Sequence, residues 1–197
     1  GAAALLVIAD PIVAVLFQRG AFGAAETVAT AGALAAYAVG LPAYVLIKVL
    51  GPGFFAREDT STPVKVAALC VVINLGLNLA LMGPLLHVGI ALATAISAWI
   101  NAALLAWLLM RRGYFRPDAR LKRVVTRTLL ASAAMAAVLW GLDRALGDVA
   151  AAVGTGWGAI GLALLVGAGI ASFAAFALLF GAARVSDLKR MLDRSAR

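Results

Sequence analysis

Long apolar stretches, separated by short polar segments, dominate the sequence. A helix that spans a bilayer needs about 20 mostly apolar residues. Six stretches approach this length, and the Gly, Pro and polar residues between them are typical of turns. We therefore predict an all-α, polytopic integral membrane protein with six transmembrane helices, at residues 2–17, 27–50, 64–82, 88–110, 128–146 and 157–182.

The composition supports a membrane protein and argues against an enzyme. Of the 197 residues, 64% are hydrophobic and 13% are charged, whereas a soluble domain is about half apolar and about a quarter charged. The excess apolar surface is predicted to face lipid. The chain has one cysteine and one histidine, and it contains neither an HExxH nor a GxSxG motif. We predict no catalytic residues, no metal site and no cofactor.

The basic residues indicate the orientation in the membrane. The net charge is +8, and all Lys and Arg residues except Arg19 and Arg144 lie within 48–65, 111–127 or 184–197. With six spans, these three regions lie on one side, which the positive-inside rule assigns to the cytoplasm. We predict an inner-membrane protein with a cytoplasmic C-terminus. Because topology accounts for the charge, nucleic acid is not expected as a partner.

The chain divides by pattern into four parts. Residues 1–112 hold four spans, 113–127 form a basic cytoplasmic loop, 128–182 form a C-terminal helix pair, and 183–197 form a basic cytoplasmic tail. Residue 1 is not a methionine and the first apolar stretch is short. We therefore expect that the protein extends further at its N-terminus.

Polar side chains inside the predicted spans are the first candidates for function, because burying them in a membrane is costly. Asn74 and Asn78 share one face of the third helix, and Thr94, Ser97 and Asn101 share one face of the fourth. One interpretation is that both stripes line a polar cavity used in transport. The other is that they hydrogen-bond neighbouring helices.

Charged residues provide further candidates. Asp10, before Pro11, is either an intramembrane carboxylate used in transport or the N-cap of a helix that restarts there. Lys48, Arg57 and Lys65 flank the connection between the second and third helices. One interpretation is that the three form an anion-binding cluster, and the other is that Lys48 simply extends to the membrane surface.

The second helix contains features that favour close packing and bending. Gly32, Ala36 and Gly40 form a stripe of small residues, and Pro42 lacks the N–H that would bond the carbonyl of Ala38. Bends of this kind mark either moving parts of transporters or static kinks. We take as candidate hinges Gly40, Pro42, and the residues that restrict the two ends of the next connection: Gly51, Pro52, Thr62 and Pro63.

Two polar stretches, in this order and spacing, resemble a known family. They are LFQRGAF at 16–22 and GFFAREDTSTPVK at 53–65, supported by AYAVGLP at 36–42 and GIALAT at 89–94. Together they resemble the MurJ (MviN) family of lipid II flippases over about residues 5–114. The matching loop residues that the resemblance adds as transport candidates are Arg19 and Asp59, beside Lys48, Arg57 and Lys65.

The resemblance implies the last six helices of a fourteen-helix fold: a C-terminal half-bundle plus a helix pair. It implies transport of undecaprenyl-linked lipid II by alternating access, with the bilayer and an N-terminal lobe of the same chain as partners. In the family the helix pair forms an apolar groove for the lipid tail, so Phe173, Phe176 and Phe180 are groove candidates. The alternatives are another polysaccharide or drug exporter of the same superfamily, and a membrane scaffold without transport.

Overall fold

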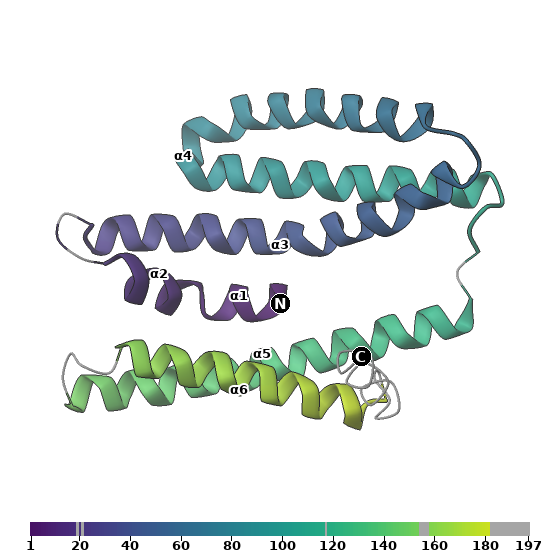
Figure 1. The fold of residues 1–197 in the computed structure, drawn as a ribbon. Coiled ribbons are helices and arrows are strands. Elements are labelled where there is room, and N and C mark those ends of the chain that lie inside the picture. The colour runs from purple at the N-terminus through teal and green to yellow at the C-terminus, as the bar shows by residue number, and fades with distance from the viewer. Residues whose placement is uncertain (19, 21, 117, 154–157, 182–197) are drawn as a thin grey trace, which may run out of the picture. The chain divides into compact units, whose positions relative to one another are not determined.

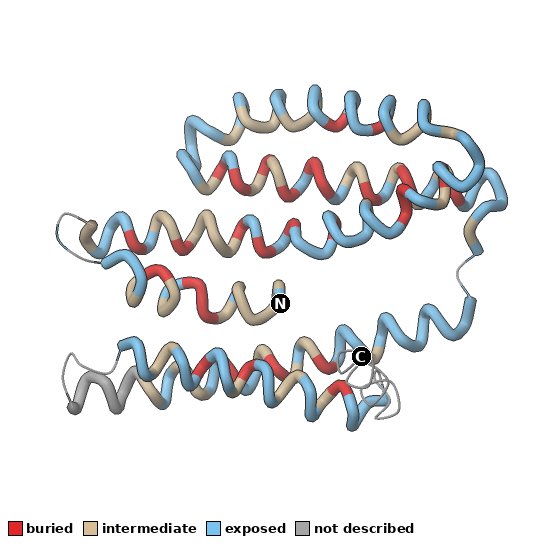
Figure 2. Tube along the Cα trace, in the orientation of Figure 1, coloured by how far each residue is buried: buried red, intermediate tan, exposed pale blue. Residues whose placement is uncertain are grey.

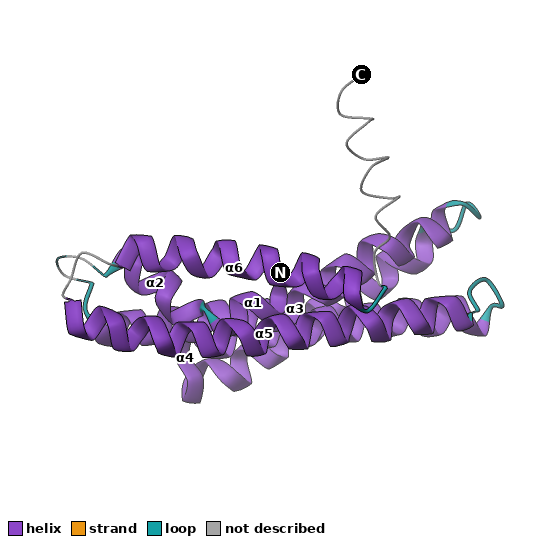
Figure 3. Ribbon diagram, turned by 90° about the horizontal axis from the view of Figure 1, so that it is seen from below, coloured by secondary structure: helices purple, strands orange, loops and turns teal. Residues whose placement is uncertain are grey.

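The computed structural model describes residues 1–18, 20, 22–116, 118–153 and 158–181, without the side chains of 147–153. These ranges contain helices and connections and no strand (Figure 3), as the all-α prediction requires. The helices are α1 (Ala2–Val7), α2 (Ala9–Phe17), α3 (Ala24–Phe55), α4 (Ser61–Arg111), α5 (Ala119–Val153) and α6 (Gly158–Leu179).

Helices α3, α4 and α6, and the Ala119–Leu146 part of α5, are long and apolar enough to cross a membrane. The 51 residues of α4 do not form one rod, because the chain reverses at Leu86, where φ is 49°. Figure 1 shows the two antiparallel arms of α4, which are the predicted third and fourth spans. The predicted third span ended too early, at residue 82. The φ of Pro84 suits a helix, and the chain turns only at Leu86.

The first predicted span is divided into α1 and α2. The break lies at Ile8, with φ −106° and ψ 20°, because Pro11 has no N–H for the carbonyl of Val7 and its ring displaces that carbonyl. Helical bonds resume with the amide of Ile12, which donates to the carbonyl of Ile8 at 3.1 Å. Asp10 is exposed and lies in the first turn of α2. Of the two alternatives for Asp10, the structure therefore contains the restarted helix, but Asp10 is not its N-cap.

The chain separates into two compact units, residues 4–116 and the part that begins at 117. In the first unit α3 lies between α2 and the second arm of α4 (Figure 1). Buried positions gather where α3 and that arm face each other (Figure 2). The first arm is more exposed, and its outward side chains are apolar: Val71, Val72, Leu75 and Leu79 are 60–69% exposed. Exposed apolar side chains of this kind are what the composition predicts for a surface that faces lipid.

The predicted stripe of small residues packs against α4. A Cβ atom at Gly40 would lie 3.0 Å from the Cα of Ala95, and one at Gly32 would lie 3.2 Å from Cγ2 of Val88. Ala36, between them, is buried. Small residues allow two backbones to approach, and in a membrane van der Waals packing is a main source of helix association. The stripe therefore has the packing role predicted for it.

Helix α3 continues past the predicted end at residue 50. It runs through Gly51-Pro52-Gly53 to Phe55, so the connection to α4 is only residues 56–60, and the expected Gly-Pro-Gly loop entry is wrong. The reason is packing: the side chain of Phe54 is fully buried in a cluster with Leu50, Val66, Cys70, Leu105 and Leu109. Keeping Phe54 helical places it in this cluster, while Pro52 is exposed.

The second unit contains α5 and α6 packed side by side (Figure 1). Leu139 of α5 is fully buried, and its Cδ1 would lie 3.4 Å from a Cβ at Gly169 of α6. Near the other end, Nη1 of Arg127 donates to the carbonyl of Gly181 at 3.1 Å. A cation at the C-terminal end of a helix satisfies a free carbonyl and complements the helix dipole.

Candidate functional site

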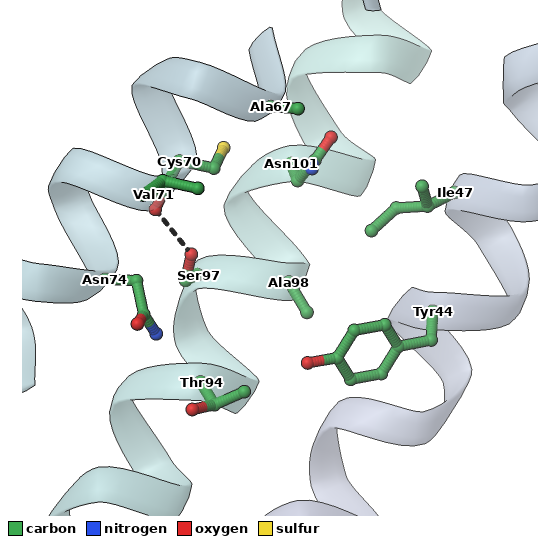
Figure 4. Close-up of a pocket in the computed structure, with 10 residues that line it drawn as sticks. All are labelled: Tyr44, Ile47, Ala67, Cys70, Val71, Asn74, Thr94, Ser97, Ala98 and Asn101. Carbon is green, nitrogen blue, oxygen red and sulfur yellow. Dashed lines mark hydrogen bonds between the residues drawn. The ribbon is translucent and has the colours of Figure 1, made fainter. Parts of the chain in front are cut away.

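A cavity of about 240 Å³ lies in the first unit, between α3 and the two arms of α4 (Figure 4). Its wall combines amide, hydroxyl and thiol groups with small apolar side chains. It is lined by Tyr44, Ile47, Ala67, Cys70, Val71, Asn74, Thr94, Ser97, Ala98 and Asn101. Of the polar residues singled out in the sequence, Asn74, Thr94, Ser97 and Asn101 meet here, whereas Asn78 lies outside the lining.

The polar residues of this region also hold helices together. The hydroxyl of Ser97 is buried and donates to the carbonyl of Cys70 at 2.8 Å, which joins the two arms of α4 (Figure 4). Nδ2 of Asn78 donates to Oδ1 of Asn74 at 2.9 Å within the first arm. The two interpretations of the polar stripes are therefore not exclusive, because Ser97 lines the cavity and bonds a neighbouring arm.

Two amide oxygens remain unsatisfied. Oδ1 of Asn78 and Oδ1 of Asn101 are buried and have no hydrogen-bond partner among the described residues. Buried polar atoms nearly always have a hydrogen-bond partner, and a buried polar atom without one destabilises the fold by about 1–3 kcal/mol. The side chain of Asn101 contributes to the cavity wall, although its Oδ1 is itself buried.

Of the two candidate hinge residues on α3, Gly40 is buried against α4, whereas Pro42 is exposed. Helix α3 stays continuous across Pro42 and bends along its length (Figure 1). Beside the proline, Nε1 of Trp99 donates to the carbonyl of Val39 at 2.9 Å, which ties α3 to the second arm of α4. Together with the contact of Gly40 and Ala95, this bond holds α3 against α4. A hinge role for Gly40 and Pro42 stays a prediction.

A second polar group lies where α3 ends and where α4 both begins and ends. We call it the loop cluster: Arg57, Asp59, Thr62, Arg112 and Tyr114. The carboxylate of Asp59 pairs with Nη1 of Arg112 and accepts the backbone N–H of Thr62 at 3.0 Å. Nη2 of Arg112 donates to the hydroxyl of Thr62 at 3.0 Å. Arg57 lies over the ring of Tyr114, 3.9 Å from its centroid.

These contacts keep Asp59 ionised. Hydrogen bonds from the side chain and backbone of Thr62, and then from Arg112, lower the pKa of Asp59 to about 2. Each of these bonds favours the charged carboxylate. Because the pKa is depressed, the stabilisation is present above the ordinary carboxylate pKa and is lost only as the pH falls toward about 2. The pairing with Arg112 is therefore complete at neutral pH.

Sequence reasoning missed Arg112 in this cluster and counted it only as a cytoplasmic charge. The other predicted residues are placed individually. Lys48, on α3, and Lys65, on α4, are exposed, Pro63 lies in the first turn of α4, and Arg19 falls outside the described residues.

On α6, the groove candidates Phe173 and Phe176 are half-buried and Phe180 is exposed. The rings of Phe176 and Phe180 stack with centroids 6.1 Å apart.

The helices, their outward apolar side chains and the polar cavity among them define a class of protein: a multi-pass α-helical membrane protein with a polar site between its spans. The chain belongs to the lipid II flippase MurJ family, whose family model matches residues 1–151. This confirms the resemblance found in the two polar stretches. The protein is a multi-pass protein of the inner membrane.

Relatives agree along nearly the whole chain. It is 41% identical over 196 residues to the "Probable lipid II flippase MurJ" of Rhizobium meliloti, which covers 99% of this chain and 37% of the relative. It is 38% identical over 190 residues to the protein of the same name from Vibrio cholerae, covering 94% and 35%. The chain therefore spans little more than a third of the length of these relatives.

A solved structure shows the same fold. It is that of "Lipid II flippase MurJ, inward closed conformation", and the TM-score is 0.68 at 22% sequence identity. The match covers 91% of this chain and 35% of the solved chain. The predicted fold class, a helical membrane protein with part of a flippase fold, is confirmed.

Proposed function

We propose that this chain is part of a transporter that moves lipid II from the cytoplasmic to the periplasmic leaflet. Its relatives bear the name of lipid II flippases. The observation that carries the proposal is the family match over residues 1–151. Transport of this kind moves a molecule and makes or breaks no covalent bond, so the protein acts without catalytic residues or a cofactor.

The cavity favours transport over the scaffold alternative. A scaffold needs packed helices, whereas α3 and α4 leave a cavity of about 240 Å³ between them, lined in part by Asn74, Thr94, Ser97 and Asn101. The alternative of another exporter of the same superfamily is opposed by the family match, which is to the lipid II flippases.

The proposed mechanism is alternating access, in which two lobes rock about a central cavity. Residues 4–116 supply helices of one lobe. The chain spans 37% of the Rhizobium meliloti relative, and we propose, as the family resemblance implies, that an N-terminal part of the same protein supplies the other lobe. Lys48, Arg57 and Lys65 are candidates to attract the anionic head of lipid II. Phe173, Phe176 and Phe180 are candidates to contact its tail.

A complementation experiment tests the proposal. In cells depleted of their own flippase, this chain joined to the N-terminal part of the Rhizobium meliloti relative should restore lipid II at the outer leaflet. The present chain alone, at equal membrane abundance, should not. Restoration by the chain alone would overturn the two-lobe proposal. A joined protein that reaches the membrane intact and never restores lipid II would overturn the assigned activity.

The proposed orientation places the loop cluster in the cytoplasm. Its basic residues gather at one end of the first unit, and the reversal at Leu86 lies at the other end of both α4 arms. Each arm, of roughly 25 residues, is about 37 Å long, enough to cross a hydrocarbon core of about 30 Å. The positive-inside rule then puts Arg57 and Arg112 in the cytoplasm and Leu86 in the periplasm.

Single cysteines in α4 test this orientation. With Cys70 replaced, Ser61→Cys and His87→Cys place exposed thiols near opposite ends of the first arm. We expect an impermeant maleimide, added to whole cells, to label the residue-87 variant and to reach the residue-61 variant only after the membrane is opened. The reverse pattern would invert the assigned topology.

A further inference from the structure

We propose that Arg112 is a positioning residue, which clamps the end of α3 and both ends of α4 so that these helices move as one body. Its role in transport rests on the proposed function, but the clamp itself is a property of the first unit alone. Its components are the loop cluster defined above and the turn that follows α4.

The clamp joins segments that are distant in the sequence. Arg112 directly follows α4, while its partners Asp59 and Thr62 lie 53 and 50 positions earlier, before and at the start of the same helix. The guanidinium uses both Nη atoms, one for the carboxylate and one for the hydroxyl. A lysine has the same charge but lacks the planar fork that makes two such bonds at once.

A second contact reinforces the first from the end of α3. Arg57 donates to the carbonyl of Gly53 at 3.3 Å and lies over the Tyr114 ring. Tyr114 is itself held by its backbone N–H, which donates to the carbonyl of Leu109 at 2.9 Å. Cation–π and ion-pair contacts thus fix the residues after α4 to the loop before it.

The underside of the clamp is apolar. The guanidinium of Arg112 lies 5.9 Å from the ring centroid of Phe54, and Phe54 is fully buried in the cluster that contains Cys70. An isolated exposed ion pair contributes little to stability, but a network with two-point geometry is the exception to that rule. Arg112 has such a network, and it covers the end of a packed core.

The first arm of α4 is the element that most needs this clamp. Its outward side is apolar and exposed, and only Val66 and Cys70 of the arm are in the buried core. The Ser97–Cys70 bond holds the middle of the arm, while Asp59 and Thr62 hold its beginning through Arg112. Without the clamp, the beginning of the arm is free to separate from α3 and from the second arm.

Labelling of Cys70, which also lines the cavity, reports this separation without a transport assay. Cys70 lies eight residues after Thr62, is 4% exposed and is the one cysteine of the chain. In the full-length protein in native membranes, with cysteines outside this chain replaced, its rate of labelling by a small membrane-permeant maleimide measures local opening. The matched control is Arg111→Ala, because Arg111 is adjacent and exposed but contacts the ring of Trp107.

We expect Arg112→Ala and Asp59→Ala to raise the labelling rate about tenfold, while Arg111→Ala leaves it near the wild-type rate. Arg112→Lys should fall between, because one of the two bonds is lost. The exchange Asp59→Arg with Arg112→Asp should recover part of the protection, because it restores the ion pair but not the acceptor for the N–H of Thr62. A merely structural defect would not be rescued in this way. Unchanged labelling in Arg112→Ala would overturn the clamp.

A measurement of lipid II transport distinguishes failure of the clamp from failure of the proposed function. If the clamp and the proposed function both hold, lipid II transport falls in Arg112→Ala at equal membrane abundance and returns in part in the exchange variant. Increased labelling with unchanged transport would overturn the positioning role. If the wild-type protein does not transport lipid II while Cys70 responds as expected, the proposed function fails and the clamp stands.

Discussion

The Gly89→Ala substitution is expected to prevent the two arms of α4 from packing together and to lower the free energy of unfolding by about 3 kcal/mol. Gly89 follows the reversal at Leu86, and a Cβ there would overlap the backbone of Leu81, 2.6 Å from its carbonyl carbon. No rotamer change relieves a clash with backbone. The arms must therefore separate, which also weakens the Ser97–Cys70 bond between them.

The matched control is Gly76→Ala, in the first arm of the same helix. A Cβ at Gly76 meets nothing within 4 Å, so alanine there should be neutral or stabilise the helix by up to about 1 kcal/mol. Membrane abundance and the midpoint of thermal unfolding in detergent are the measurements. Equal abundance and equal midpoints for the two variants would show that the close approach at Gly89 is not needed for the fold.

Truncating Phe54 to alanine is expected to cost about 3–5 kcal/mol, as for a buried aromatic residue that leaves a cavity. Phe54 is fully buried beside Leu50, Leu105 and Leu109, at the point where α3 meets both arms of α4. Its loss also removes the apolar support beneath Arg112. We therefore expect faster maleimide labelling of Cys70 as well as a lower unfolding midpoint.

The neighbouring residue supplies the control. Phe55 is 53% exposed, so Phe55→Ala removes the same number of atoms from the surface and should cost little. The two variants should differ widely in unfolding midpoint and in Cys70 labelling. Similar values for both would contradict the buried role of Phe54 and the continuation of α3 through Gly51-Pro52-Gly53.

The sequence by itself determined the class of protein, most of the spans and the family. Hydrophobic length is a local property that the bilayer imposes on each helix separately, so α3, α6 and the arms of α4 were visible without knowledge of their neighbours. The stripe of Gly32, Ala36 and Gly40 was also readable, because helical spacing alone puts these residues on one face. The loop motifs indicated the family for the same local reason.

Tertiary structure decided which groups meet and where helices end. Gly51-Pro52-Gly53 is a turn signal, yet burial of Phe54 keeps it helical. Asp59 finds its partner in Arg112, 53 positions away, and Ser97 finds the carbonyl of Cys70, 27 positions away. Such pairs depend on how the arms of α4 fold back and in which register they pack. That register is set by how the side chains of neighbouring helices fit together. The pattern of residues along a single helix does not reveal this fit.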